Sequence, residues 1–260
     1  MYPLKIRDVT LGEGRPKICI PVMGKDKEEI LRQARIAAAA PSDLIEFRAD
    51  AFAQILEKGQ ISPVWESLRL ILGDKPLLFT FRTSHEGGER AISFQDYESL
   101  LKTAADSGFC DVIDVEVFMD GWQISERIRE LITHIQGKGA AVLASNHDFV
   151  KTPEEGRIVE RLRAMDKAGA DILKMAVMPH SREDVLTLLK ATVKVRESDI
   201  CKPLVTMSMG DLGLVSRLCG ETFGADMTFG TGAKASAPGQ MEALKLQEVL
   251  EAIHQTMSQS

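Results

Sequence analysis

The chain has 260 residues, of which 44% are hydrophobic, 27% charged and 5% aromatic, and its formal net charge at pH 7 is −6. This composition is that of a folded globular protein and excludes disordered and collagen-like classes. The acidic balance argues against a broad basic surface for nucleic acid, and the scarcity of aromatic residues argues against base-stacking platforms and membrane aromatic belts.

The start of the chain and the cysteines indicate a compartment. Residues 1–8 carry charges and lack the apolar core of a signal peptide, and no stretch approaches the roughly 18 consecutive apolar residues of a membrane helix. Cys19, Cys110, Cys201 and Cys219 are far apart, with neither a CxxC pair nor zinc-finger spacing, which is typical of small buried side chains. We therefore expect a cytoplasmic protein without disulfides, bound to neither membrane nor nucleic acid.

Short apolar, β-rich runs recur along the chain and predict eight strands. Consecutive runs begin 24 to 36 residues apart, which is about the length of a strand, a crossover helix and two loops. The runs are Lys17–Gly24, Leu44–Asp50, Pro76–Arg82, Val112–Phe118, Ala140–Phe149, Ile172–Pro179, Pro203–Gly210 and Met227–Gly232.

The segments between these runs show helical patterns. Ser93 and Ser181, each followed three residues later by an aspartate, predict helix N-caps, and Thr152, directly before a proline, predicts a third. Apolar residues at helical spacing over residues 124–135, followed by Gly137, predict a fourth helix. Strands therefore alternate with helices along the chain.

This alternation predicts an α/β protein, a single (β/α)₈ TIM barrel over residues 1–260. The alternative is a doubly wound open sheet, which usually has a GxGxxG turn after its first strand. The turn Met23–Asp26 has no such motif, which favours the barrel. We further expect residues 8–14 to form a short hairpin that closes the bottom of the barrel.

Polar residues occur at the ends of the predicted strands, where barrel enzymes place their reacting groups. Taken singly, most have an ordinary structural explanation, such as an ion pair or a hydrogen-bonded layer formed by Asp114 and Glu116. Their shared position at strand ends favours one functional site. The residues are Glu46, Arg48, Arg82, Asp114, Glu116, His147, Lys174, Arg217, Ser236 and Gln240.

Lys174 is the most informative of these residues, because it interrupts an apolar run and lysine is rarely buried unless paired or functional. Glu46, Glu86 or Glu116 are candidate structural partners. A desolvated lysine has a lowered pKa and can condense with a carbonyl to form an imine, an electron sink for loss of a neighbouring proton. His147, on the preceding strand, has the pKa range needed to move that proton.

Supporting groups complete this chemistry. Glu86 or Asp148 could fix the tautomer of the histidine, and the clustered arginines could bind carboxylate or hydroxyl groups through forked hydrogen bonds. The combination indicates a small, anionic, hydroxylated carbonyl substrate.

The same part of the predicted barrel offers residues for two other ligand classes. Glu46, Asp114, Glu116 and His147 could hold a divalent ion only if the neighbouring cations lay elsewhere, which opposes a metal site. A phosphate site is the other contender, because phosphate-binding barrels use the loops after their last two strands. The glycines at those positions are Gly210, Gly213, Gly230 and Gly232, which serve tight turns equally well.

An ordered set of short segments spans nearly the whole chain. They are Gly12–Gly14 with Pro16–Ile18, Ile45–Arg48, Lys75–Arg82, Glu86–Gly88, Ser145–Phe149, Lys174–Pro179, Val215–Leu218 and Ala235–Gln240. In this order they closely resemble the type I 3-dehydroquinate dehydratases, the Schiff-base enzymes of the shikimate pathway.

The resemblance implies a role for each matching residue. Lys174 matches the lysine that forms the imine, His147 the general acid/base, Glu86 its acidic partner and Arg217 the arginine that binds the substrate carboxylate. Further substrate contacts are implied for Glu46, Phe47, Arg48, Arg82, Ser236 and Gln240, and apolar walls for Met207, Met209 and Phe229.

The implied reaction is a syn elimination of water from 3-dehydroquinate, giving 3-dehydroshikimate through an enamine. The resemblance implies no metal and no dissociable cofactor, and it implies a homodimer. The chain departs from the family at Pro21, where some relatives have a serine that touches the substrate, because proline offers neither a hydroxyl nor a backbone donor. A small-residue loop over residues 225–239 is a plausible lid.

Two other functions remain open on the sequence. A class I aldolase-like lyase acting on a phosphorylated sugar would use the same lysine with a phosphate site after the last strand. A barrel that has lost catalysis and serves as a binding module is the non-enzymatic alternative.

Overall fold

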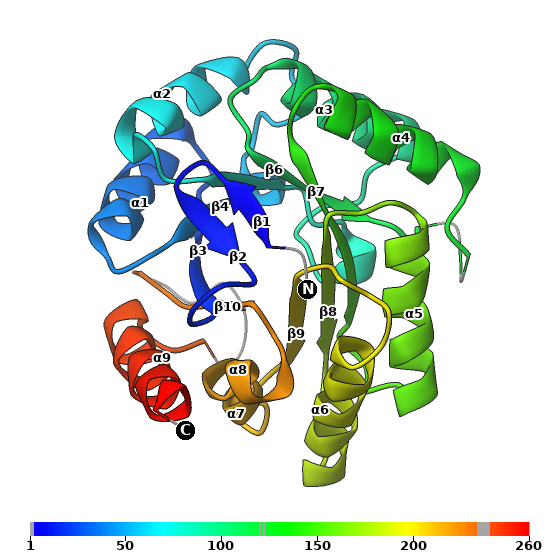
Figure 1. Ribbon diagram of the computed structural model, residues 1–260. Coiled ribbons are helices and arrows are strands. Elements are labelled where there is room, and N and C mark those ends of the chain that lie inside the picture. Colours follow the sequence, from blue (N-terminus) through cyan, green and yellow to red (C-terminus); the bar gives the residue numbers. More distant parts are fainter. Residues whose placement is uncertain (1–2, 120, 122, 233–239, 260) are drawn as a thin grey trace.

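The computed structural model describes residues 3–119, 121, 123–232 and 240–259. Within these residues, eight parallel strands form a nearly closed barrel surrounded by helices (Figure 1). All eight predicted strands are confirmed, with bounds that differ by up to three residues. They are β3 Lys17–Met23, β4 Leu44–Arg48, β5 Leu77–Thr80, β6 Val112–Glu116, β7 Ala141–Asp148, β8 Ile172–Val177, β9 Leu204–Ser208 and β10 Met227–Phe229.

The strands pair in the order β10–β3–β4–β5–β6–β7–β8–β9. Asp226, directly before β10, joins the two ends of this series. Its backbone nitrogen donates to the Leu204 carbonyl at 2.8 Å, and its Oδ2 accepts from the Leu204 backbone nitrogen at 2.7 Å. The predicted barrel, rather than an open sheet, is therefore the observed architecture.

Helices connect the strands on the outside of the barrel, as Figure 1 shows. The amphipathic pattern of each main helix turns its apolar residues toward the strands. The helices are α1 Lys27–Ala39, α2 Ser62–Leu72, α3 Phe94–Asp106, α4 Glu126–Gly137, α5 Glu155–Lys167, α6 Arg182–Arg196, α7 Leu214–Leu218, α8 Gly220–Phe223 and α9 Ala243–Ser258, with short 3₁₀ turns η1 Ala49–Ala51 and η2 Ser84–Glu86.

The predicted helix caps are confirmed at two of three positions. Ser93 and Ser181 accept from backbone nitrogens three residues later and begin α3 and α6, the second with a complete capping box. The prediction for Thr152 is wrong, because its hydroxyl donates to the Met178 carbonyl at 3.0 Å and α5 begins only at Glu155. A hydrogen bond to the loop after β8 therefore replaces the N-cap that was expected at Thr152.

The N-terminal hairpin lies earlier in the chain than predicted. Its strands are β1 Leu4–Ile6 and β2 Val9–Leu11, and the turn contains Arg7 at φ 51°. The predicted N-terminal hairpin is confirmed, but its bounds of 8–14 are wrong, because Gly12 and Gly14, both at positive φ, form the loop after β2. Ile6 and Leu11 are buried in one apolar cluster with barrel-interior residues that include Cys19, Leu44 and Leu78, so the hairpin does cover an end of the barrel.

Alternation along the strands divides the core into two layers. One face points into the barrel, and the other packs against the helices. Phe47 and Phe79 belong to the outer layer, where their ring centroids are 6.0 Å apart and Trp65 contacts Phe79 edge-on at 5.4 Å. Among the described residues, no helix is both long and apolar enough to cross a membrane. The four cysteines are free thiols, two of them buried.

Candidate functional site

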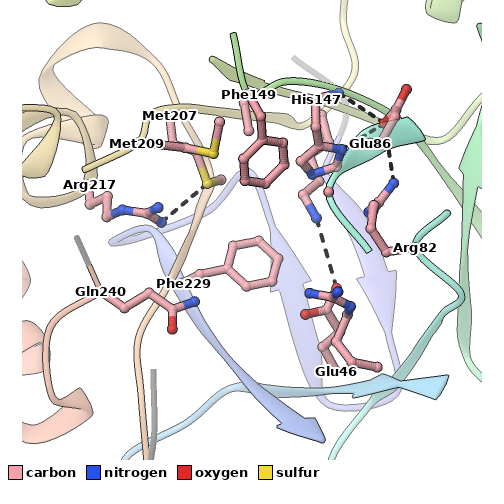
Figure 2. Close-up of a pocket in the computed structure, with 14 residues that line it drawn as sticks. Glu46, Arg82, Glu86, His147, Phe149, Met207, Met209, Arg217, Phe229 and Gln240 are labelled. Carbon is pink, nitrogen blue, oxygen red and sulfur yellow. Dashed lines mark hydrogen bonds and ion pairs between the residues drawn. The ribbon is translucent and has the colours of Figure 1, made fainter. Parts of the chain in front are cut away.

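A cavity of about 290 Å³ opens at the carboxyl ends of the barrel strands. Its polar lining brings together most of the residues singled out in the sequence, and Figure 2 shows Arg217 across the cavity from His147 and Glu86. The polar lining residues are Glu46, Arg48, Arg82, Glu86, His147, Lys174, Arg217 and Gln240, and the apolar ones include Phe149, Ala176, Met207, Met209 and Phe229.

Lys174, in the middle of β8, projects into this cavity and is only 4% exposed. Its Nζ lies 3.9 Å from Glu46 Oε1, a predicted partner, and 3.6 Å from Asp114 Oδ2, which was not predicted. The ammonium also lies 4.5 Å from the centroid of the Phe229 ring. Thr80 holds Glu46 in place by donating its hydroxyl to Oε1 at 2.8 Å. The lysine is therefore buried between two carboxylates and an aromatic face.

Arg82 organises the carboxylates on one side of the cavity. Its Nη2 donates to Asp114 at 2.6 Å, and its Nη1 donates to Glu116 at 2.9 Å and lies 3.4 Å from Glu86 Oε2. Burial alone would lower the pKa of Arg82, but these three carboxylates more than offset it and raise the pKa well above its ordinary value. Asp114 and Glu116 thus form the hydrogen-bonded layer expected from the sequence.

His147 and Glu86 form a tightly bonded pair. Glu86 Oε2 lies 2.8 Å from His147 Nδ1 and accepts from the His147 backbone nitrogen at 2.9 Å. Burial, followed by the charge of Glu116, raises the pKa of Glu86 to about 8. Burial, followed by the cations Arg82 and Lys174, holds the pKa of His147 well below its ordinary value. The histidine is therefore neutral at neutral pH, with Nδ1 turned to Glu86.

Asp148, the other proposed partner of the histidine, has a different position. Its Oδ1 accepts from the backbone nitrogens of Val150 at 3.1 Å and Lys151 at 3.0 Å, so it caps the loop after β7. Glu86 alone of the two predicted partners contacts the His147 ring.

Arg48 lies at the end of β4 and pairs with a carboxylate that sequence reasoning missed. Its Nε and Nη2 donate to the two oxygens of Asp50, each at 2.9 Å. Asp50 is fully buried and also accepts from the backbone nitrogens of Arg82 and Glu89, at 3.3 and 3.2 Å. Asp50 ended the same predicted strand as Arg48, which was the available signal.

The opposite wall of the cavity is largely apolar. Arg217, on the short helix α7, donates from Nη1 to the thioether sulfur of Met207 at 3.2 Å. Burial lowers the pKa of this guanidinium to about 10. Met209 and Phe229 extend the wall, and all three predicted apolar residues line the cavity. This wall combines a buried cation with nonpolar surfaces, an arrangement suited to one end of an anionic ring compound.

One candidate residue points away from the cavity, and another is not among the described residues. Phe47 points to the helix-facing side of β4, because neighbouring strand residues point to opposite faces and Glu46 and Arg48 face inward. Ser236 falls outside the described residues, as does the part of the expected lid over residues 233–239. Pro21 is buried in β3, level with Glu46 in the strand register.

Phe149 lines the cavity and was not predicted to do so. It follows β7 and packs against Gly87, which has φ 84°. A Cβ atom on Gly87 would lie 2.3 Å from a ring carbon of Phe149, so only glycine permits this approach. The sequence signal was the glycine pair directly after Glu86.

The metal and phosphate alternatives find little support in this geometry. Within the described part of the chain, no group of three or more histidine, cysteine, aspartate and glutamate side chains is placed to hold a metal ion. Of the glycines considered for phosphate, Gly213 has a close steric requirement instead. A Cβ there would lie 2.2 Å from the Ser208 carbonyl oxygen.

Comparisons with known proteins agree with one another. The family model described as Type I 3-dehydroquinase matches residues 18–257. A 3-dehydroquinate dehydratase from Klebsiella pneumoniae is 47% identical, covering 95% of this chain and 96% of that protein. One from Bacillus licheniformis is 43% identical, covering 98% of each chain.

Solved structures show the same similarity in three dimensions. The type I 3-dehydroquinate dehydratase from Clostridium difficile, determined with covalent modified comenic acid, superposes with a TM-score of 0.93 at 43% identity, covering 98% of this chain and 99% of that one. A 3-dehydroquinate dehydratase from Geobacillus kaustophilus gives a TM-score of 0.93 at 35% identity, covering 98% and 97%.

Proposed function

The chain belongs to the type I 3-dehydroquinase family, and from this premise we propose that it catalyses the syn dehydration of 3-dehydroquinate to 3-dehydroshikimate through an imine on Lys174. The observation that carries the mechanism is the burial of Lys174 at the centre of a cavity that also holds His147 and Arg217. The Clostridium difficile relative was determined with covalent modified comenic acid, which supports the proposal of a nucleophilic side chain.

The first step forms the imine. Lys174 gives a proton to His147 and attacks the substrate ketone carbon with its amine. His147 then returns this proton to the hydroxyl of the carbinolamine, which leaves as water and gives a protonated imine. Asp114 and Glu46, at 3.6 and 3.9 Å from Nζ, stabilise that cation. The protonated imine then acts as the electron sink for the next step.

The second step is the elimination. His147 takes a proton from the carbon next to the imine, and the electron pair moves into the imine to give a neutral enamine. The enamine returns the pair as the neighbouring hydroxyl leaves, and His147 gives its proton to that hydroxyl, so water departs. One base acting on one face of the ring accounts for syn stereochemistry. Hydrolysis of the product imine then regenerates Lys174.

Binding uses the two unlike walls of the cavity. Arg217 pairs with the substrate carboxylate, while Glu46, Arg48, Arg82 and Gln240 contact the ring hydroxyls, together with Ser236 from the undescribed segment. The apolar side chains of Met207, Met209 and Phe229 pack against the ring and exclude water.

The proposal includes the setting of the enzyme. The chain acts in the shikimate pathway as one catalytic domain, without a metal or dissociable cofactor, in a cytoplasmic homodimer. Sedimentation velocity tests the dimer, and activity retained after exhaustive chelation tests the absence of a metal requirement.

Borohydride trapping tests the chemistry directly. Reduction during turnover with 3-dehydroquinate should attach the ligand mass to the peptide that contains Lys174. Lys174→Met should abolish both the adduct and the ultraviolet absorbance of the conjugated product while still binding a quinate-like acid. Lys167→Met, an exposed change on α5, is the matched control. Turnover without an adduct, or an adduct on another residue, would exclude Lys174 as the nucleophile.

A further inference from the structure

The carboxamide of Asn146 lies between Glu86 and an arginine from the outer helical layer. Asn146 Nδ2 donates to Glu86 Oε1 at 2.8 Å, and Arg161 Nη1 donates to Asn146 Oδ1 at 2.9 Å. Asn146 precedes His147 in β7, whereas Arg161 belongs to α5. All three side chains are buried, so these contacts are protected from competing water.

Arg161 determines which way the amide of Asn146 faces. A guanidinium has donors only, so the amide must present its oxygen to Arg161 and its NH₂ group to Glu86. Without the arginine, the amide could rotate and present its oxygen to the carboxylate. A cavity of about 380 Å³, lined by Glu86, Asn146, His147 and Arg161, lies on this side of the pair and leaves room for such a rotation.

The orientation of the amide affects the proton on Glu86. Both carboxylate oxygens accept hydrogen bonds, Oε1 from Asn146 and Oε2 from His147. Donors to a carboxylate favour its charged form, and the Asn146 donor lowers the pKa of Glu86 against burial and Glu116, which raise it. The positive charge of Arg161 acts in the same direction, since Glu86 and Arg161 interact electrostatically.

We propose that Arg161 is a positioning residue for the dehydration, which acts through Asn146 to favour the ionised form of Glu86 and with it the His147 tautomer that carries its proton on Nδ1. This proposal rests on the function proposed above, in which His147 accepts a substrate proton. An ionised Glu86 accepts the Nδ1 hydrogen and leaves the Nε2 lone pair available. A protonated Glu86 instead donates to Nδ1, and the histidine hydrogen then resides on Nε2, where no base is available to the substrate.

The other charges around Glu86 come from several elements and stay constant when Arg161 is replaced. Near Arg161 itself lie Asp148, Arg157 and Glu160. Those acting on Glu86 or His147 are Arg48 of β4, Arg82 after β5, Asp114 and Glu116 of β6, and Lys174 of β8. A change in pH dependence on replacing Arg161 therefore reports the Arg161–Asn146 contact.

The test compares two arginines of one helix. Arg161→Met removes the buried donor, and Arg163→Met makes the same change at an exposed position of α5. In Arg161→Met, the midpoint of the acid limb in the pH profile of kcat/KM should rise by about one pH unit. On that limb kcat/KM should therefore fall about tenfold at a given pH, and it should recover at alkaline pH. KM should change little, borohydride should still trap substrate on Lys174, and Arg161→Lys should restore the profile in part. Arg163→Met should match wild type.

Asn146→Ala provides a second route to the same result, because it removes the amide while leaving the arginine. It should shift the acid limb in the same direction, which keeps the proposal testable if Arg161→Met does not fold. A wild-type pH profile in either folded variant, or a loss of kcat that is equal at all pH values, would show a purely structural role and overturn the proposal. Failure of the proposed function is distinct, since wild type itself would then show neither turnover nor adduct.

Discussion

Arg82 and Arg217 are two arginines of the same cavity, 3% and 2% exposed, whose environments have opposite effects. Three carboxylates surround Arg82 and raise its pKa well above the ordinary value, whereas burial lowers the pKa of Arg217 to about 10. The difference shows that burial by itself does not assign a role to a charge. Arg82 neutralises charges that the protein already holds, whereas Arg217 lies beside a thioether, and we propose it for the binding of an incoming anion.

The largest effect that we expect from this comparison is a loss of unfolding free energy when Arg82 is replaced. Arg82→Met leaves Asp114, Glu116 and Glu86 buried without their shared cation, and breaking such a pair costs about 3–5 kcal/mol of unfolding free energy. Urea unfolding of Arg82→Met and Arg217→Met, the same change at two buried sites, checks this. The comparison fails if Arg217→Met is destabilised as much as Arg82→Met.

The crowded carboxylates on the Arg82 side predict a pH dependence. The pKa of Glu86 is raised from 4.5 to about 8, so between these pH values the folded protein holds a proton that the unfolded chain has lost. Its contribution to stability is complete below pH 4.5 and is lost as the pH rises through about 8. Glu86→Gln has no such proton and should gain stability relative to wild type over that range, by a few kcal/mol at about 1.4 kcal/mol per unit of pKa shift.

Thermal melting of wild type and Glu86→Gln across this pH range measures the gain. Glu130→Gln, on the exposed side of α4, removes a charge without burial and should track wild type at every pH. A constant difference between Glu86→Gln and wild type would show that Glu86 titrates alike in the folded and unfolded states.

For Arg217 the main effect should appear in binding. Arg217→Met removes the charged partner of the substrate carboxylate, and a hydrogen bond to a charged group contributes about 1.5–3 kcal/mol. We expect KM, and the inhibition constant of quinate-like acids, to rise roughly 10- to 100-fold. Steady-state kinetics measure both quantities. Unchanged inhibition by these acids would show that the substrate carboxylate does not bind to Arg217.

The smallest effect concerns the apolar wall itself. Met207→Leu keeps the volume but removes the sulfur that accepts from Arg217, and volume-conserving swaps usually cost less than about 1.5 kcal/mol. KM should rise by less than in Arg217→Met. Met175→Leu, in the helix-facing layer of the same barrel, should leave KM unchanged. An effect of Met207→Leu as large as that of Arg217→Met would mean that the thioether positions the guanidinium.

Most of the fold could be predicted because its signals are local. Strand spacing, apolar alternation and the caps at Ser93 and Ser181 depend on neighbours within a few residues. The error at Thr152 has a distant cause, because its hydroxyl binds the Met178 carbonyl instead of capping α5. The error in the hairpin bounds has a local cause, because Gly12 and Gly14 belong to the loop after β2.

The candidate site was partly predictable for the same reason. Lys174 is visible as the charged residue of an apolar run, His147 as a polar residue near a strand end, and Arg217 as a cation that follows a strand. The alternation that turns Glu46 and Arg48 inward also predicts that Phe47 points outward. The ion-pair partners of these residues could not be predicted in the same way, because the chain contains many acidic residues that could pair with each basic one.

The sequence by itself determined the barrel and predicted which polar residues gather at the carboxyl ends of its strands, since both depend on periodicity and on strand direction. Tertiary structure decided which partner each charged group meets: Asp114 lies near Lys174, Glu116 accepts from Arg82, and Arg161 donates to Asn146. These contacts depend on the relative height of neighbouring strands and on helix packing. The same tertiary packing places three carboxylates around Arg82, which raise its pKa, and buries Arg217, which lowers its pKa.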